Sequence, residues 1–156
     1  EKKAIIEAHN SNPLRTYNRG FNKFSAMTKD EFRQTFLTLQ TNTPFIHHPI
    51  GSLRQSPSGD IDWRQQGAVG PIKDQGHCGS CWAFSATGGL EGLSKIATGK
   101  LNIFSEQQMI DCVTLNNGCH GGQMRRALAY VKDNGIALES DYPYKAVQGQ
   151  CLMPKG

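Results

Sequence analysis

Short helical patterns make up the first part of the chain. Residues 1–10 carry a helical pattern of apolar and polar positions. A second helix is predicted from Thr28, because Thr28 and Glu31 have the spacing of a capping box. The residues that follow at three- and four-residue spacing indicate an amphipathic helix: Phe32, Thr35, Phe36 and Leu39.

Three more helices are predicted in the second part of the chain. The first starts near Ser80, a suitable N-cap, and ends at Gly99. The second begins at Ser105, which forms another capping box with Gln108. The third covers residues 123–134. Its apolar face consists of Met124, Ala127, Leu128 and Val131.

Residues 41–60 have a different character from the segments on either side. They contain three prolines, together with several glycines and serines: Pro44, Pro49 and Pro57. Such a composition predicts an extended, exposed connector, which is where proteases cut. We therefore divide the chain into residues 1–57 and residues 58–156.

Composition narrows the functional classes. The chain has 156 residues, of which 37% are hydrophobic and 19% charged, as in a globular domain. Its net charge is +4, but the 17 basic and 13 acidic residues are interspersed, so we expect no nucleic-acid partner. No stretch approaches the roughly 20 apolar residues of a membrane span, so we expect no membrane partner. The chain begins within a helical pattern and without Met, which suggests that a segment precedes it.

The five cysteines all lie in the second part of the chain: Cys78, Cys81, Cys112, Cys119 and Cys151. An odd number leaves one thiol unpaired if the others form disulfides. Cys78 and Cys81 also form a C-x-x-C pair, and Cys119 with His120 would complete a zinc site on paper. The odd cysteine count and the Trp82 that follows directly argue against zinc or redox chemistry. We expect neither a metal nor a cofactor.

Cys81 has the surroundings of a nucleophile. A thiol attacks only as thiolate, and the first turn of a helix that starts at Ser80 would favour a negative sulfur. Gln75 lies six residues earlier, and its side-chain amide, with the backbone N–H of Cys81, would donate to a developing oxyanion. The alternative is a buried, purely structural cysteine.

The segment Cys78-Gly-Ser-Cys-Trp82 resembles the signature of the papain/cathepsin cysteine proteases. Other segments of residues 60–156 resemble that family in the right order: Asp62-Trp-Arg64, Pro71-Ile-Lys-Asp-Gln75, Ser105 to Cys112, Gly118-Cys-His-Gly-Gly122 and Tyr142-Pro-Tyr144. The resemblance implies an α+β, papain-like fold, of which this chain carries mainly the helical half.

The resemblance also assigns roles to individual residues. It implies disulfides between Cys78 and Cys119 and between Cys112 and Cys151, with Cys81 left free as the nucleophile. Gln75 becomes the oxyanion donor. The substrate-binding residues that it implies are Gly79, Ser80, Trp82, Gly121, Gly122 and Met124. For Met124 the alternative is packing within its own helix.

Residues 1–42 resemble the end of the inhibitory propeptide of the same family. Ile6-x-x-x-Asn10 and Gly20-Phe-Asn22-Lys-Phe24 match two of its motifs. The family pattern has Asp where this chain has Ala26, which weakens any claim that the usual carboxylate controls pH-dependent release. The implied partners are polypeptide substrates and the chain's own propeptide, which would occupy the cleft.

These observations predict a cysteine endopeptidase zymogen, monomeric when complete, in an acidic vacuole or lysosome or outside the cell. The histidine and asparagine of this family follow the nucleophile by about 130–150 residues. We therefore expect them after Gly156. None of the histidines present matches the catalytic position: His9, His47, His48, His77 and His120. The alternative is a naturally short, inactive, inhibitor-like binding protein.

We expect the 156 residues to be poorly stable or to aggregate when expressed alone, because one wall of the cleft would face solvent. A thermal melt and an assay with a Leu-Arg-type fluorogenic peptide test this expectation. A sharp cooperative melt together with peptide hydrolysis would contradict it.

Overall fold

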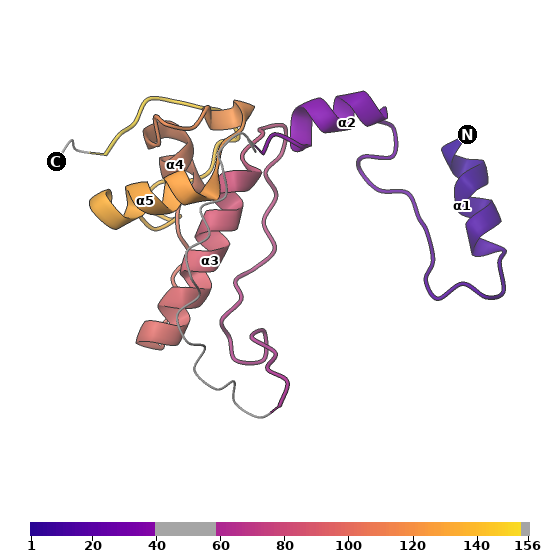
Figure 1. Cartoon of the computed structure of the whole chain (residues 1–156), viewed down its shortest axis with the longest axis horizontal. Coiled ribbons are helices and arrows are strands. Elements are labelled where there is room, and N and C mark those ends of the chain that lie inside the picture. The colour runs from indigo at the N-terminus through magenta and orange to yellow at the C-terminus, as the bar shows by residue number, and fades with distance from the viewer. Residues whose placement is uncertain (40–58, 154–156) are drawn as a thin grey trace, which may run out of the picture. The chain divides into compact units, whose positions relative to one another are not determined.

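The computed structural model describes residues 1–39 and 59–153 (Figure 1). Its contacts divide the chain into two compact units, Glu1–Gln34 and Thr35–Gly156. Nearly all of the predicted connector lies outside the described residues, and so does the proposed division between residues 57 and 58. That division therefore stays a prediction.

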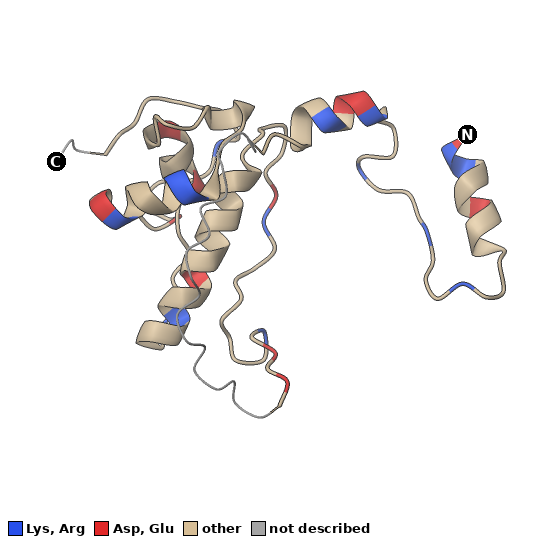
Figure 2. Cartoon of the chain, in the orientation of Figure 1, with Lys and Arg blue, Asp and Glu red and all other residues tan. Residues whose placement is uncertain are grey.

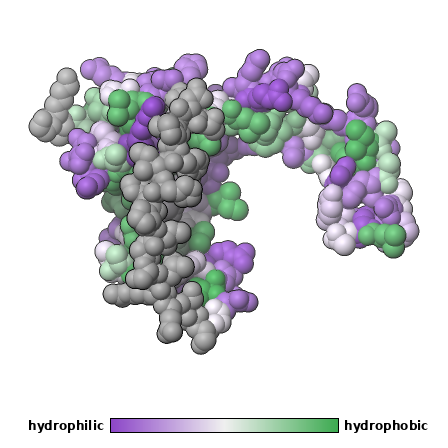
Figure 3. Space-filling view, viewed as in Figure 1, coloured by the Kyte–Doolittle hydropathy of each residue, from purple (hydrophilic) through white to green (hydrophobic). Residues whose placement is uncertain are grey.

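Two helices form in the N-terminal part, α1 (Lys2–Asn10) and α2 (Lys29–Phe36). The capping box before α2 is confirmed in both directions. The backbone N–H of Thr28 donates to Glu31 Oε2 at 2.6 Å, and the N–H of Glu31 donates to Thr28 Oγ1 at 3.2 Å. These hydrogen bonds from Thr28 lower the pKa of the Glu31 carboxyl. Figure 3 shows hydrophilic residues along the upper side of α2 and hydrophobic ones along its lower side.

The helix α2 is shorter than its apolar pattern suggests. It ends at Phe36, so the placement of Leu39 on this helix is wrong. Leu39 instead forms an isolated parallel β-bridge with Gly122, far away in the sequence. Backbone pairing with the second part of the chain therefore replaces the helix at this point.

The loop that contains Ala26 is closed by a lysine. The Nζ atom of Lys2 donates to the backbone carbonyl of Ser25 at 2.9 Å, and also to the carbonyl of Met27. Both acceptors are backbone groups that do not titrate. The contact between α1 and this loop therefore uses no carboxylate at position 26.

The second unit is built on α3 (Cys81–Thr98), α4 (Glu106–Cys112) and α5 (Met124–Asn134), with a short 3₁₀ helix, η1 (Gly118–His120). The predicted ends of α3 and α5 are confirmed, and Gly99 ends α3 in a left-handed conformation (φ 77°). Beside the helices, the described residues contain isolated β-bridges but no strand. This agrees with the expected helical half of the fold.

A small apolar core joins α3 to α4 and α5. Trp82, Ala83 and Ala86 of α3 pack against Met109 of α4 and Ala127 of α5, and all of them are buried. Figure 2 shows α3 almost free of charge, since Glu91 and Lys95 are its only charged residues. This apolar composition lets α3 serve as the central helix of the unit.

Only one half of the predicted capping box at Ser105 forms. The N–H of Gln108 donates to Ser105 Oγ at 3.0 Å. The side chain of Gln108 does not return to Ser105; its Oε1 accepts from the N–H of Ala137 at 2.6 Å. The N–H of Ser105 donates to the carbonyl of Ala137 at 3.0 Å, so a distant segment replaces the local partner.

A buried charge cluster lies between α3, α4 and the segment before α3. Lys73 Nζ is 2.7 Å from Glu91 Oε1 and 2.6 Å from Glu106 Oε1, and Thr87 Oγ1 also donates to Glu106. Burial alone would lower the pKa of Lys73, but the hydrogen bonds and charges of the two glutamates outweigh it and raise the pKa. The ammonium therefore stays charged at neutral pH.

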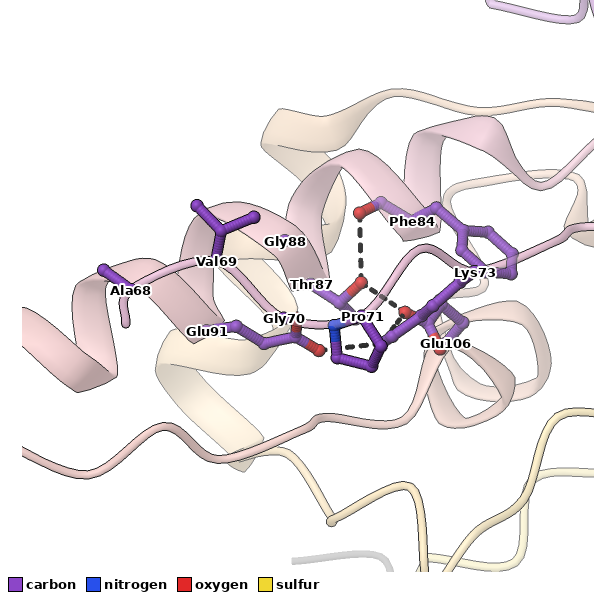
Figure 4. A pocket seen from close by; sticks show the side chains of 10 residues that line it. All are labelled: Ala68, Val69, Gly70, Pro71, Lys73, Phe84, Thr87, Gly88, Glu91 and Glu106. Atoms are coloured by element: carbon purple, nitrogen blue, oxygen red, sulfur yellow. Dashed lines mark hydrogen bonds and ion pairs between the residues drawn. The ribbon is translucent and has the colours of Figure 1, made fainter. Parts of the chain in front are cut away.

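This cluster borders a pocket of about 280 Å³. In Figure 4 the side chains of Lys73, Thr87 and Glu106 point toward one another beside Pro71. Cys81 is not among the residues that line this pocket.

Among the described residues, no helix has the length and apolar character needed to span a membrane.

Lys73→Met is expected to lower the free energy of unfolding of the full-length protein by about 3–5 kcal/mol, because two buried carboxylates would lose their cation. Urea denaturation at neutral pH measures the loss. The matched control is Lys95→Met, since Lys95 is also half-buried, but its Nζ donates to the backbone carbonyl of Gly99 rather than to a carboxylate. This control should cost at most about 1 kcal/mol. Equal losses in the two variants would contradict the importance of the cluster.

Candidate active site

Cys81 is the first residue of α3 and the free cysteine of the structure. Its side chain is half-buried. Ser80 is the N-cap residue before it, as predicted, although its side chain makes no capping hydrogen bond. The Ser80 hydroxyl lies 2.9 Å from the hydroxyl of Tyr144 instead. The helix start therefore leaves its first N–H groups without a side-chain cap.

Gln75 lies in the loop that leads to α3. Its side-chain Nε2 donates to the carbonyl of Cys78 at 2.7 Å, which holds the amide against its own loop. The backbone carbonyl of Gln75 accepts a hydrogen bond from the hydroxyl of Tyr144 at 2.7 Å. A primary amide has two N–H bonds, so the bond to Cys78 leaves one available.

Two disulfides join Cys78 to Cys119 and Cys112 to Cys151, across 41 and 39 residues. Because Cys78 and Cys119 bind each other, neither is available as a zinc ligand. Among the described residues, no group of three or more His, Cys, Asp and Glu side chains is placed to hold a metal. The backbone N–H of Gly79 also donates to the carbonyl of Cys119 at 2.8 Å, which seats the loop before α3 against η1.

A short N-terminal segment runs along the glycines of this site. Leu39 pairs with Gly122 in the parallel bridge, and the Oγ1 of Thr38 donates to the carbonyl of Gly79 at 2.9 Å. The same Oγ1 is 4.0 Å from Cys81 Sγ. A Cβ on Gly121 would lie 2.1 Å from the carbonyl oxygen of Thr38, so only glycine permits this approach. No motif points to Thr38, because the apolar pattern places it inside a helix that is predicted to continue to Leu39.

The predicted substrate-binding residues differ in burial. Trp82 and Ser80 are fully buried in this structure, in which residues 38–39 lie against the site. Trp82 packs in the core and its indole N–H donates to the carbonyl of Gly118 at 3.1 Å. Met124 packs against the same core, which supports the alternative that was left open for it. Of the predicted substrate-binding residues, Gly79, Gly121 and Gly122 are the ones that border the extended segment at residues 38–39.

The described histidines do not supply a base for Cys81. His77 and His120 are exposed, and no described histidine forms a hydrogen bond with Cys81 Sγ. The ring of His77 lies 6.4 Å from the ring of Phe36. The site therefore contains a free thiol, a nearby amide and a glycine edge, which are the features of one half of a thiol-protease site.

Comparisons with known proteins agree with this class. The family described as papain family cysteine protease matches residues 57–155, and the cathepsin propeptide inhibitor domain matches residues 1–32. Germination-specific cysteine protease 1 of Arabidopsis thaliana is 42% identical over 94% of this chain and 42% of its own length. Digestive cysteine proteinase 1 of Homarus americanus is 46% identical over 87% of this chain and 44% of its own length.

Solved structures give the same result. The proform of the ragweed pollen allergen Amb a 11, a cysteine protease, has a TM-score of 0.83 and 39% identity, over 96% of this chain and 49% of that protein. A Carica candamarcensis cysteine protease in complex with E-64 has a TM-score of 0.59 and 52% identity, over 60% of this chain and 44% of that protein.

The chain belongs to the papain family of cysteine proteases and carries part of the associated propeptide domain. Its described residues form the helical half of the papain-like fold. The chain spans about half the length of the relatives it matches. These relatives are proteases or their precursors, which favours the enzyme over the inhibitor-like alternative.

Gly79→Ala is expected to disrupt the loop before α3, because a Cβ there would lie 2.4 Å from the backbone carbonyl of Cys119. We expect a loss of roughly 1–3 kcal/mol from overpacking, measured by thermal unfolding of the full-length protein. Gly89→Ala is the control, since a Cβ at this position of α3 meets nothing within 4 Å. The control should be neutral or stabilising by up to about 1 kcal/mol. A variant at Gly79 as stable as the one at Gly89 would contradict the tight fit.

Proposed function

We propose that this chain is part of a cysteine endopeptidase zymogen. The observation that carries the proposal is the placement of the free Cys81 at the start of α3, beside a glycine edge that an extended segment already occupies. The family membership supports the same reaction. The proposal assigns peptide-bond hydrolysis to the full-length protein.

In the proposed reaction the thiolate of Cys81 attacks the carbonyl carbon of the scissile peptide bond. A C–S bond forms, the carbonyl oxygen becomes an oxyanion, and the C–N bond then breaks as the leaving amine takes a proton. Water hydrolyses the resulting thioester and restores the thiol. In this proposal the proton donor is a histidine outside the 156 residues, as the family resemblance implies.

Two N–H groups of this chain are assigned to the oxyanion. One is the backbone N–H of Cys81, in the first turn of α3, where N–H groups have no partner within the helix. The other is the second N–H of the Gln75 amide, whose first N–H binds Cys78. Donors that are fixed before reaction stabilise the oxyanion without further reorganisation.

The backbone of Gly121 and Gly122 is assigned to binding the extended substrate. The bridge between Leu39 and Gly122 supports this assignment, since main-chain hydrogen bonds bind peptides regardless of their side chains. Residues 38–39 therefore occupy the position proposed for a substrate. The N-terminal part would in this way inhibit its own protease. Cleavage within residues 41–60 would release it.

The two disulfides fit an oxidising location. Together with the family membership, they support delivery to a lysosome or acidic vacuole, or secretion. The complete enzyme is proposed to act as a monomer on polypeptide substrates.

The test uses the full-length protein after removal of its N-terminal part. The unmodified enzyme should hydrolyse a fluorogenic peptide and be labelled by E-64 at Cys81. Cys81→Ala should lose both properties. Gln75→Ala should keep the labelled thiol but lower kcat by roughly 10²–10³-fold, the usual effect of losing one oxyanion donor.

Gln65→Ala is the matched control for Gln75→Ala, because Gln65 is an exposed glutamine whose amide bonds only to Asp62. This control should keep full activity. A full-length protein that binds a related protease tightly but hydrolyses no peptide and takes no E-64 label would support the inhibitor-like alternative instead.

A further inference from the structure

A side chain far along the sequence holds the loop before α3. The hydroxyl of Tyr144 donates to the backbone carbonyl of Gln75 at 2.7 Å and lies 2.9 Å from Ser80 Oγ. The ring of Tyr144 packs edge-on against Phe84 of α3, with ring centroids 5.0 Å apart. The backbone N–H of Tyr144 donates to Glu139 Oε1 at 2.8 Å. Tyr144 is therefore held both at its backbone N–H and at its hydroxyl group.

The hydrogen bonds of this phenol have a defined direction. A phenol carries one hydrogen, and the carbonyl of Gln75 can only accept, so the Tyr144 hydrogen goes to Gln75. Ser80 must then donate to the Tyr144 oxygen, since its other acceptor, the carbonyl of Cys78, is 3.4 Å away. Burial raises the pKa of Tyr144, so the phenol keeps its hydrogen at neutral pH.

This chain of hydrogen bonds connects the two ends of the active-site loop. At one end is Gln75, whose side-chain amide is the assigned oxyanion donor. At the other end is Ser80, the residue directly before Cys81. Both contacts meet at one oxygen atom of Tyr144, so a shift of that atom would change the position of the amide relative to the thiol.

We propose that Tyr144 is a positioning residue, whose hydroxyl sets the place of the Gln75 amide relative to Cys81. This role rests on the proposed function, because it acts through the oxyanion donor of that reaction. Tyr144 touches neither the thiol nor the scissile bond. Its contribution should therefore depend entirely on the presence of the Gln75 side chain.

Tyr144→Phe in the full-length enzyme tests the proposal, since it keeps the ring on Phe84 and the bond to Glu139 and removes only the hydroxyl. We expect kcat to fall by about tenfold to a hundredfold, the range of a small misplacement of a catalytic group. KM should stay within about twofold, because the substrate contacts are unchanged. Titration with E-64 gives the concentration of active enzyme, so misfolded protein does not enter kcat.

Tyr142→Phe is the matched control. Its hydroxyl donates to Asp111 Oδ2 at 2.9 Å and is also 3.3 Å from the carbonyl of Gln150, which are contacts of α4 and the C-terminal segment. This variant should lower the melting temperature but leave kcat unchanged. An equal fall in kcat for both tyrosines would overturn the positioning role.

A double-mutant cycle with Gln75→Ala gives the decisive measurement. In that background Tyr144→Phe should cause no further loss of kcat, because there is no amide left to position. Ser80→Ala removes the other hydroxyl of the chain and should show the same non-additivity, which keeps the test decisive if Tyr144→Phe does not fold. Equal losses with and without the Gln75 amide would overturn the proposal.

The cycle also separates this proposal from the proposed function. If the unmodified full-length protein hydrolyses no peptide, the proposed function fails, and the role of Tyr144 fails with it. If the unmodified protein is active and the two substitutions are additive, only the role of Tyr144 is overturned.

Discussion

The disulfide between Cys78 and Cys119 connects the loop before α3 to the turn around η1, across 41 residues of sequence. The hydrogen bond from Gly79 N–H to the carbonyl of Cys119 makes the same connection through the backbone. Cys81 and the glycine edge at residues 121–122 lie on the two segments that this bridge joins. Without that link, the thiol and the backbone proposed to bind the substrate would belong to separate loops.

Helix α4 contributes polar side chains to the interior of the second unit. Glu106, Gln107 and Gln108 of α4 are all fully buried, and each is hydrogen-bonded. An unpaired buried polar group costs about 1–3 kcal/mol, so each of these side chains specifies its partner strongly. Their partners include Lys73, in the segment before α3, and residues of the segment after α5. In this way α4 fixes both segments that hold the active-site loop, including the one that carries Tyr144.

In the proposed zymogen, the same geometry would combine the thiol of Cys81 with the segment that restrains it. The glycines that open the site to an extended peptide also admit Thr38 and Leu39, because no Cβ blocks their approach. The contact of Thr38 with Gly79 places a hydroxyl, which is a poor target for a thiolate, next to Cys81. Under the proposed function, access for a substrate and occupation by residues 38–39 would therefore be two uses of one surface.

Local sequence alone determined the start of α2 and the end of α3. The capping box at Thr28 and the helix end at Gly99 follow from residues within a few positions of one another. The free Cys81 followed from the odd number of cysteines and the family resemblance. Tertiary structure decided the hydrogen-bond partners of side chains that can bind several groups. The hydroxyl of Ser80 binds that of Tyr144, and the side chain of Gln108 binds the backbone of Ala137. In the folded chain Trp82 is also buried, and Leu39 forms a bridge with Gly122 instead of continuing the predicted helix. The physical reason is that such groups have several possible partners of similar strength, and only the folded chain determines which partner comes within reach.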